Sequence, residues 1–211
     1  MPWEIFRAPV GGRPVDLYTK SGDLPGYAAY AVLVPEYGVG ATINAAGAAA
    51  YRATALLLDL VAAALVPELE ALARRQAQAA YAGRYATVPA ANRTADELVL
   101  AVDAGPGLKI DRWTSRGLDV FAGLALITGA KNTSDLEARL YPVGDGGRWR
   151  MVVETPASGK GVVARTCDSW MKTDQFRYGG LPVDEFDFET DGTRVKAAKA
   201  LGLRQTFVKK G

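Results

Sequence analysis

Histidine is absent from the 211 residues, and its absence removes several classes of chemistry. Ser-His-Asp and Cys-His catalysis need an imidazole base, and many metal sites need imidazole ligands. Lysine, tyrosine, carboxylates and the terminal amine remain as candidate bases. The single cysteine, Cys167, cannot form an internal disulfide, and a lone thiol is usually a small buried apolar group. The sequence therefore gives no reason to expect a metal or another cofactor.

Charge and hydrophobicity argue against two classes of partner. Lysine and arginine number 25 against 23 aspartates and glutamates, and the basic residues are scattered, so nucleic acid is not an expected partner. The longest apolar run, Ala53 to Val66, contains Thr54 and Asp59 and is too short to span a membrane. Residues 1–7 have no basic segment leading into an apolar one, so no signal peptide is expected.

The first zone of the chain is predicted to form an antiparallel sheet. β-prone residues favour strands at Val15–Thr19, Tyr27–Val34 and Val39–Asn44. Residues 21–26 are rich in turn formers, and Pro35-Glu36-Tyr37-Gly38 is typical of a tight reversal. Three strands joined by two turns are therefore expected.

A helical zone is predicted at residues 48–80, because Leu58, Val61 and Leu65 share one helix face. Pro67 is expected to divide this zone into two helices, since proline is tolerated in a first turn but not in a helix interior. Core packing explains the apolar stripe.

From residue 81 onward, short β-prone runs alternate with Gly, Pro and Asp turns. The main runs are Leu98–Val102, Leu108–Trp113, Leu140–Val143, Trp149–Val153, Val162–Thr166 and Glu185–Glu189. Asp191-Gly192 is the strongest hairpin signal in the chain. About eight to ten strands at this spacing favour a barrel or a sandwich. The expected fold is α+β, with strands and helices in residues 1–80, an all-β domain in residues 81–211, and a boundary near residues 78–84.

A longer motif surrounds Lys20-Ser21-Gly22. The triplet alone carries little information, but it follows a predicted strand and precedes Gly26-Tyr27 and Pro35-Glu36-Tyr37-Gly38-Val39-Gly40. The whole run resembles the third motif of serine β-lactamases and penicillin-binding proteins, K-[ST]-G, with the P-E-x-x-[GIV] reversal that follows it. In that superfamily the motif lies on the strand edging the active site. The resemblance implies that residues 1–80 are the end of a β-lactamase-like antiparallel sheet with its C-terminal helices.

The resemblance covers essentially the full chain and is strongest to fungal β-lactamase-related, transpeptidase-like proteins with a C-terminal β domain. The matching segments are Trp3-Glu4-Ile5-Phe6-Arg7, Tyr81-Ala82-Gly83-Arg84-Tyr85, Phe176-Arg177-Tyr178-Gly179-Gly180 and Asp184-Glu185-Phe186. This resemblance implies that the full-length parent is secreted. The N-x-S/T triplets that begin at Asn92 and Asn132 fit that location.

The resemblance implies roles for four residues. Lys20 would supply charge and Ser21 a hydrogen bond to a substrate carboxylate beside the scissile amide. Gly22 would leave room for the acyl group. The N–H of Asp23 would be one of two oxyanion donors, a kind of contact worth roughly 3 to 4 kcal/mol in kcat. These groups position a substrate, but none of them attacks it.

The family nucleophile is missing from its expected place. It belongs to an S-x-x-K motif at a helix start, and a Y-x-N or S-x-N motif completes the proton route; both precede K-S-G in the family. Only 19 residues precede Lys20, too few for the helical domain that bears them. Ser169-Trp170-Met171-Lys172 satisfies S-x-x-K literally, but it follows Lys20 in a zone predicted to be β-rich, so we interpret it as a chance match.

Two other groups of residues have plain structural explanations. The alternating carboxylates of one predicted strand and turn are Asp184, Glu185, Asp187, Glu189 and Asp191. They are typical of a solvated face, with a calcium site as the alternative. The tryptophans predicted to lie in the core rather than on a stacking platform are Trp113, Trp149 and Trp170.

The sequence thus favours a truncated β-lactamase-related serine hydrolase segment that is inactive alone. A small-molecule or peptide-like substrate would require the missing N-terminal region, either encoded upstream, so that Met1 is not the true start, or supplied in trans by another chain. The alternative is a non-catalytic module whose β barrel binds a small ligand or a partner. A sheet without its covering domain would expose apolar surface, so self-association is expected.

Overall fold

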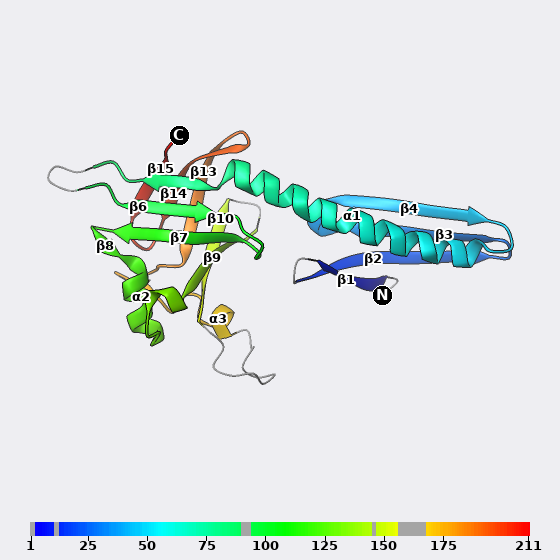
Figure 1. Cartoon of the computed structure of the whole chain (residues 1–211), viewed down its shortest axis with the longest axis horizontal. Coiled ribbons are helices and arrows are strands. Elements are labelled where there is room, and N and C mark those ends of the chain that lie inside the picture. Colours follow the sequence, from blue (N-terminus) through cyan, green and yellow to red (C-terminus); the bar gives the residue numbers. More distant parts are fainter. Residues whose placement is uncertain (1–2, 11–12, 90–93, 145–146, 156–167) are drawn as a thin grey trace. The chain divides into compact units, whose positions relative to one another are not determined.

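The computed structural model of the chain describes residues 3–10, 13–89, 94–144, 147–155 and 168–211 (Figure 1). It is an α+β structure dominated by strands. The chain divides into two compact units, Met1–Gln76 and Ala77–Gly211, and each is considered by itself.

The first unit is a four-stranded antiparallel sheet with a long helix lying along it (Figure 1). The strands pair in sequence order, and the elements are β1 (Glu4–Val10), β2 (Arg13–Leu24), β3 (Tyr27–Val34), the 3-10 turn η1 (Pro35–Tyr37), β4 (Val39–Ala46) and α1 (Ala50–Ala80). The core forms where Leu17 and Val32 of the sheet pack with Leu58 and Val66 of the helix. The predicted P-E reversal is confirmed as η1, which ends at the left-handed Gly38.

The sheet differs from the sequence prediction in two respects. A further strand, β1, precedes those predicted and pairs with β2 over its whole length. The turn expected at residues 21–26 is restricted to Pro25-Gly26, because β2 continues in register with β3 as far as Leu24 opposite Tyr27. The K-S-G segment therefore lies within a strand.

The prediction that Pro67 separates two helices is wrong, because α1 runs unbroken from Ala50 to Ala80. Proline removes one intrahelical hydrogen bond at this position. On either side of it, Val66 is buried in the core and Glu70 is held by hydrogen bonds from Arg13 and Tyr37. These contacts hold the helix together across the proline.

The second unit is a closed antiparallel barrel, which decides between the predicted barrel and sandwich. Nine strands form one sheet in the order β6-β5-β15-β14-β13-β10-β9-β7-β8. The additional pairing of β6 with β7 closes this sheet into a barrel, and the short strand β8 pairs only with β7, outside the closed ring. The strands are β5 (Gly83–Ala86), β6 (Glu97–Ala101), β7 (Leu108–Ser115), β8 (Leu118–Asp119), β9 (Glu137–Pro142), β10 (Arg148–Glu154), β13 (Glu185–Asp191), β14 (Arg194–Ala200) and β15 (Gln205–Lys209).

Short elements decorate the barrel. They are α2 (Val120–Thr128), η2 (Thr133–Asp135), α3 (Asp168–Met171), β11 (Arg177–Tyr178) and β12 (Leu181–Pro182). The helix α2 was not predicted; the Asp119 side chain caps its first turn and the left-handed Gly129 ends it. The Asp191-Gly192 hairpin is confirmed between β13 and β14. The predicted strand Val162–Thr166 and Cys167 lie outside the described residues.

Large side chains fill the barrel interior. Tyr85, Leu98, Trp113, Phe186 and Phe207 are all fully buried there. Two predicted core tryptophans are confirmed, since Trp113 and Trp149 are both buried, but Trp170 is 44% exposed, so that part of the prediction is wrong. Among the described residues, no helix combines the length and the hydropathy that a membrane crossing requires.

Candidate functional site

The K-S-G segment lies where β2 extends beyond the end of β1. Pairing of β1 with β2 stops at Thr19, opposite Glu4, whereas pairing of β2 with β3 continues to Leu24. Within the described residues, the β2 edge from Lys20 to Leu24 therefore has no partner strand on the β1 side. Backbone groups on such an edge are free to bind an extended ligand.

Lys20 and Ser21 converge on one carboxylate oxygen at this edge. The Nζ atom of Lys20 lies 3.1 Å from Oε1 of Glu4, and the Ser21 hydroxyl donates to the same oxygen at 3.3 Å. The Thr19 hydroxyl donates to the backbone oxygen of Glu4 at 2.9 Å and holds the end of β1 beside them. About half of the Lys20 side chain and of the Glu4 side chain is exposed. An ammonium and a hydroxyl thus hold a carboxylate in a position that solvent can reach.

The next two residues of the motif, Gly22 and Asp23, are exposed. A Cβ atom built at Gly22 would meet no other atom within 4 Å. Steric crowding within the described part of the chain therefore does not explain a glycine at this position.

Two residues beside the motif were missed in the sequence, Glu4 and Tyr30. Tyr30 lies opposite Ser21 in the pairing of β2 with β3. Burial raises the pKa of Tyr30, the neighbouring Tyr51 and the carboxylates of Glu4 and Asp23 raise it further, and only the Lys20 ammonium opposes them. The phenol is therefore protonated at neutral pH and can donate a hydrogen bond. The register in which β2 pairs with β3 places Tyr30 beside Ser21, and the sequence alone did not give that register.

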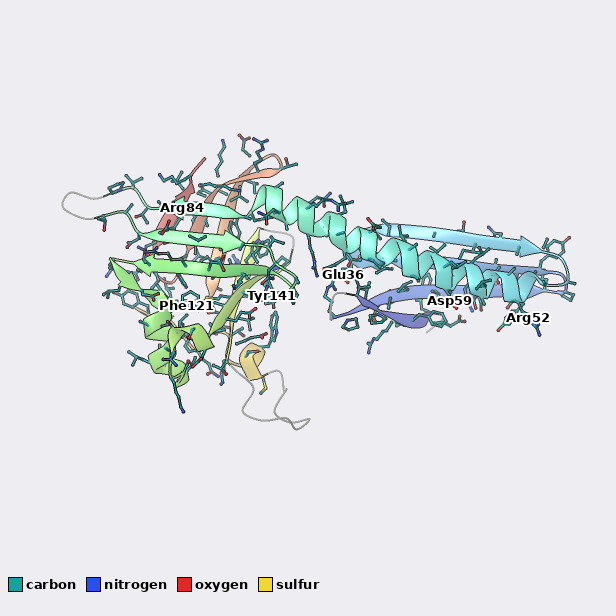
Figure 2. The ribbon with its side chains drawn as sticks, viewed as in Figure 1. Glu36, Arg52, Asp59, Arg84, Phe121 and Tyr141 are labelled. Atoms are coloured by element: carbon teal, nitrogen blue, oxygen red, sulfur yellow. The ribbon has the colours of Figure 1, made fainter. Side chains whose placement is uncertain are left out.

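A largely apolar groove of about 610 Å³ lies between β1 and α1. Phe6 and Val10 of β1 and Leu58 of α1 line it, and Tyr30 contributes to its wall. Asp59 of α1, labelled in Figure 2, adds a carboxylate to this lining, and Arg7 of β1 adds a guanidinium. The groove can therefore hold an apolar segment.

The S-x-x-K match lies in the second unit, apart from Lys20. Ser169 occupies the four-residue helix α3 and Lys172 the turn after it, within a unit that is β-rich as expected. Lys172 is exposed. The hydrogen bonds of the described residues join the two residues through their backbones, with none from the Ser169 hydroxyl to the Lys172 ammonium. The described contacts therefore give no support to Ser169 as a nucleophile.

The acidic strand has structural partners within the described part of the chain. Asp184 is only 1% exposed, so the predicted solvated face is wrong for this residue. Its Oδ2 atom accepts hydrogen bonds from Arg150 at 3.0 Å and from the backbone N–H of Asp174 at 3.1 Å, and Glu185 lies 2.9 Å from the same arginine. Within the ranges that the structure describes, no three His, Cys, Asp or Glu side chains are grouped as a metal site. Ion pairing explains the cluster: Arg150 holds Asp184 and Glu185, whereas Asp187, Glu189 and Asp191 pair with Arg148, Lys199 and Lys196 respectively. The calcium alternative gains no support.

The barrel offers little support for the ligand-binding alternative. Its fully buried aromatic and aliphatic side chains meet one another across the interior, where the rings of Trp113 and Phe186 lie 5.1 Å apart. Such packing leaves the space to side chains, as in small filled barrels. Among the described residues, the features suited to ligand binding are therefore better developed on the first unit.

Comparisons with known proteins agree with the resemblance seen in the sequence. The chain is 28% identical over 246 residues to "Beta-lactamase-like protein" of Arthroderma benhamiae, in an alignment covering 100% of this chain and 40% of that protein. It is 25% identical over 235 residues to "Probable hydrolase clz13" of Cochliobolus lunatus, covering 99% of this chain and 37% of that protein. The chain thus spans about 40% of the length of these relatives.

No solved structure shows significant similarity to the chain. The sequence model described as "Beta-lactamase-like-like, C-terminal domain" matches residues 73–211, which include the whole barrel and more than half of the chain. The protein therefore belongs to the β-lactamase-like-like family and carries its C-terminal domain.

Proposed function

We propose that the chain supplies one wall of the active site of a β-lactamase-like serine hydrolase, with the β2 edge from Lys20 to Asp23 as the substrate-binding surface. One observation carries the proposal: the Lys20 ammonium and the Ser21 hydroxyl hold the same carboxylate oxygen, at 3.1 and 3.3 Å. This is the donor pair that a substrate carboxylate beside a scissile bond requires. Gly22 leaves the neighbouring space open, and the Asp23 N–H is the proposed oxyanion donor.

The attacking group is proposed to come from polypeptide other than these 211 residues. Lys20, Ser21 and Asp23 can bind and polarise a substrate, but nucleophilic catalysis of this kind needs a serine with a lysine base beside it. The relatives extend well beyond the aligned region, since the chain spans about 40% of their length. Their additional length is sufficient for an S-x-x-K and a Y-x-N motif, and one of these proteins is named a probable hydrolase.

The isolated chain is therefore expected to show no acyl transfer. A fluorescent penicillin should leave no covalent label on it, and a chromogenic cephalosporin should be turned over no faster than in buffer. Mass spectrometry of the intact protein checks the first result and absorbance the second. Labelling that disappears in Ser169→Ala but persists in Ser134→Ala, an exposed serine of the same unit, would identify Ser169 as a nucleophile and overturn the proposal.

The first unit is further proposed to self-associate when the rest of the hydrolase is absent. Leu56 and Leu60 lie one turn apart on α1 and are 60% and 56% exposed, and Ile5 and Leu33 of the sheet are exposed as well. Exposed large apolar side chains on both the helix and the sheet favour association.

Light scattering after gel filtration is expected to show dimers or larger species at micromolar concentrations. The double variant Leu56→Glu/Leu60→Glu should shift the mass toward the monomer, because two carboxylates on one face oppose burial. Leu118→Glu changes a leucine of the barrel unit that is 73% exposed and is the control. A monomeric wild-type chain would contradict this expectation.

A further inference from the structure

The Lys20–Ser21 pair is already occupied by a side chain of this protein. Glu4 lies opposite Thr19 in the β1–β2 register, yet its carboxylate reaches along β2 to residues 20 and 21. Its Oε1 atom takes the place that an oxygen of a substrate carboxylate would take between the two donors. The hydrogen bond from Thr19 to the Glu4 backbone holds β1 in the register that permits this contact.

An ordinary surface ion pair on the same two strands shows how this contact differs. Arg7 and Asp16 are direct register partners, and the Arg7 Nε donates to Asp16 Oδ1 at 2.8 Å. That pair joins facing residues across the ladder. Glu4 instead extends past its own partner, and a single oxygen accepts both an ammonium and a hydroxyl on the unpaired edge.

The charges at this edge do not favour an anionic ligand. Lys20 contributes one positive charge, and Glu4 and Asp23 contribute two negative charges. An incoming carboxylate would have to displace Glu4 from Lys20 and Ser21 and would meet the repulsion of both acids. A neutral ester or amide carries no charge that Glu4 or Asp23 would repel.

We infer that Glu4 is a specificity-determining residue that directs this site toward substrates without a carboxylate beside the scissile bond. The inference rests on the proposed function, in which Lys20 and Ser21 face the substrate, and narrows it, because the carboxylate that occupies this donor pair is that of Glu4 and not of a substrate. Glu4 neutralises the Lys20 ammonium and occupies the Ser21 donor, so the wall accepts an uncharged ester or amide group and discriminates against anionic β-lactam-like compounds.

The test is anion binding to the 211-residue chain, followed at the Lys20 side-chain resonances by NMR. The probes are N-acetylglycine, which carries a carboxylate beside an amide, and its neutral twin N-acetylglycinamide. Wild-type protein is expected to show no saturable shift with N-acetylglycine. Glu4→Gln should bind it at least about tenfold more tightly than wild type, because the ammonium and hydroxyl are released for a charge-assisted contact. Lys20→Ala added to Glu4→Gln should abolish that binding.

Asp16→Asn is the matched control, since it removes the acid of the neighbouring ion pair on the same strands. It should leave the Lys20 resonances unresponsive to N-acetylglycine. Backbone amide spectra of each variant verify that the sheet is retained. Equal affinity of wild type and Glu4→Gln for N-acetylglycine overturns the role of Glu4 and leaves the proposed function standing. Failure of Glu4→Gln to bind N-acetylglycine at all overturns the assignment of Lys20 and Ser21 as a carboxylate-binding pair, and the inference with it.

Discussion

Replacement of Trp113 by alanine is expected to lower the free energy of unfolding of the barrel unit by about 3–5 kcal/mol. Trp113 is fully buried on β7, and its ring packs against that of Phe186 at 5.1 Å. Its Nε1 atom has no hydrogen-bond partner in the described part of the chain, so the loss is one of packing rather than of a hydrogen bond. A closed barrel filled by side chains collapses poorly around a cavity, whereas removal of an unpaired buried N–H offsets part of the loss, which places the cost within this range and not above it.

Urea denaturation measures this loss, with fluorescence of the remaining tryptophans reporting on the barrel. Three of the four tryptophans lie in the second unit, and only Trp3 belongs to the first. Trp170→Ala is the matched control, because Trp170 is 44% exposed, contacts only the ring of Tyr141 among the aromatic pairs of the described residues, and should shift the transition less. A loss below about 1 kcal/mol for Trp113→Ala would mean that the barrel is not packed as described.

Replacement of Arg13 by methionine is expected to destabilise the first unit by about 2–3 kcal/mol. Arg13 lies 2.8 Å from Glu70 Oε2 and 2.5 Å from Glu36 Oε1, and the Tyr37 hydroxyl donates to Glu70 at 2.6 Å. Methionine would leave the Glu70 carboxylate, whose side chain is only 12% exposed, without its cation from β2. Arg74 remains 3.1 Å from Glu70 and Arg13 is itself partly exposed, so the loss stays below that of a fully buried pair.

The same hydrogen bonds and charges make the effect of this variant on the free energy of unfolding depend on pH. Burial alone would raise the pKa of Glu70, but hydrogen bonds from Tyr37 and Arg13 and the charge of Arg13 outweigh burial and hold the pKa below its ordinary value. A carboxyl with a lowered folded-state pKa stabilises the fold above its unfolded pKa of about 4.3, and this contribution is lost as the pH falls further.

The difference in unfolding free energy between wild type and Arg13→Met should therefore narrow between about pH 5 and pH 3. Far-UV circular dichroism follows the transition, since α1 supplies most of the helix in the described part of the chain. Arg7→Met is the control, because the Arg7–Asp16 pair is exposed and its loss should leave the transition nearly unchanged. An unchanged transition for Arg13→Met would show that the Arg13–Glu70 contact does not hold the helix to the sheet.

Local signals predicted the parts of the fold that depend on neighbouring residues. β-prone runs located β3 and β4, the P-E sequence located η1, and the Asp191-Gly192 pair located the hairpin of β13 and β14. Contacts between residues distant in sequence were not accessible in this way. The β6–β7 pairing that closes the barrel and the continuity of α1 through Pro67 both depend on tertiary packing.

The candidate site was predictable to the extent that it lies in one short motif. Lys20 and Ser21 were found because K-S-G is followed at a characteristic distance by a P-E reversal. Glu4 was missed because its role depends on the strand β1, which was not predicted. The Gly11-Gly12 dipeptide is a hairpin signal between Val10 and Arg13, which the structure pairs, but prolines on both sides weaken a strand prediction.

The proline inside α1 has a mechanical consequence. Because Pro67 carries no N–H, the carbonyl of Ala63 lacks its intrahelical donor, and one backbone hydrogen bond of the helix is missing. Ala63 and Pro67 both line the groove beside β1, so the gap faces the same side as the groove. Kinks of helices occur at positions of this kind. Bending of α1 at Pro67 would therefore change the width of the groove while the hydrogen-bonded turns on either side stay intact.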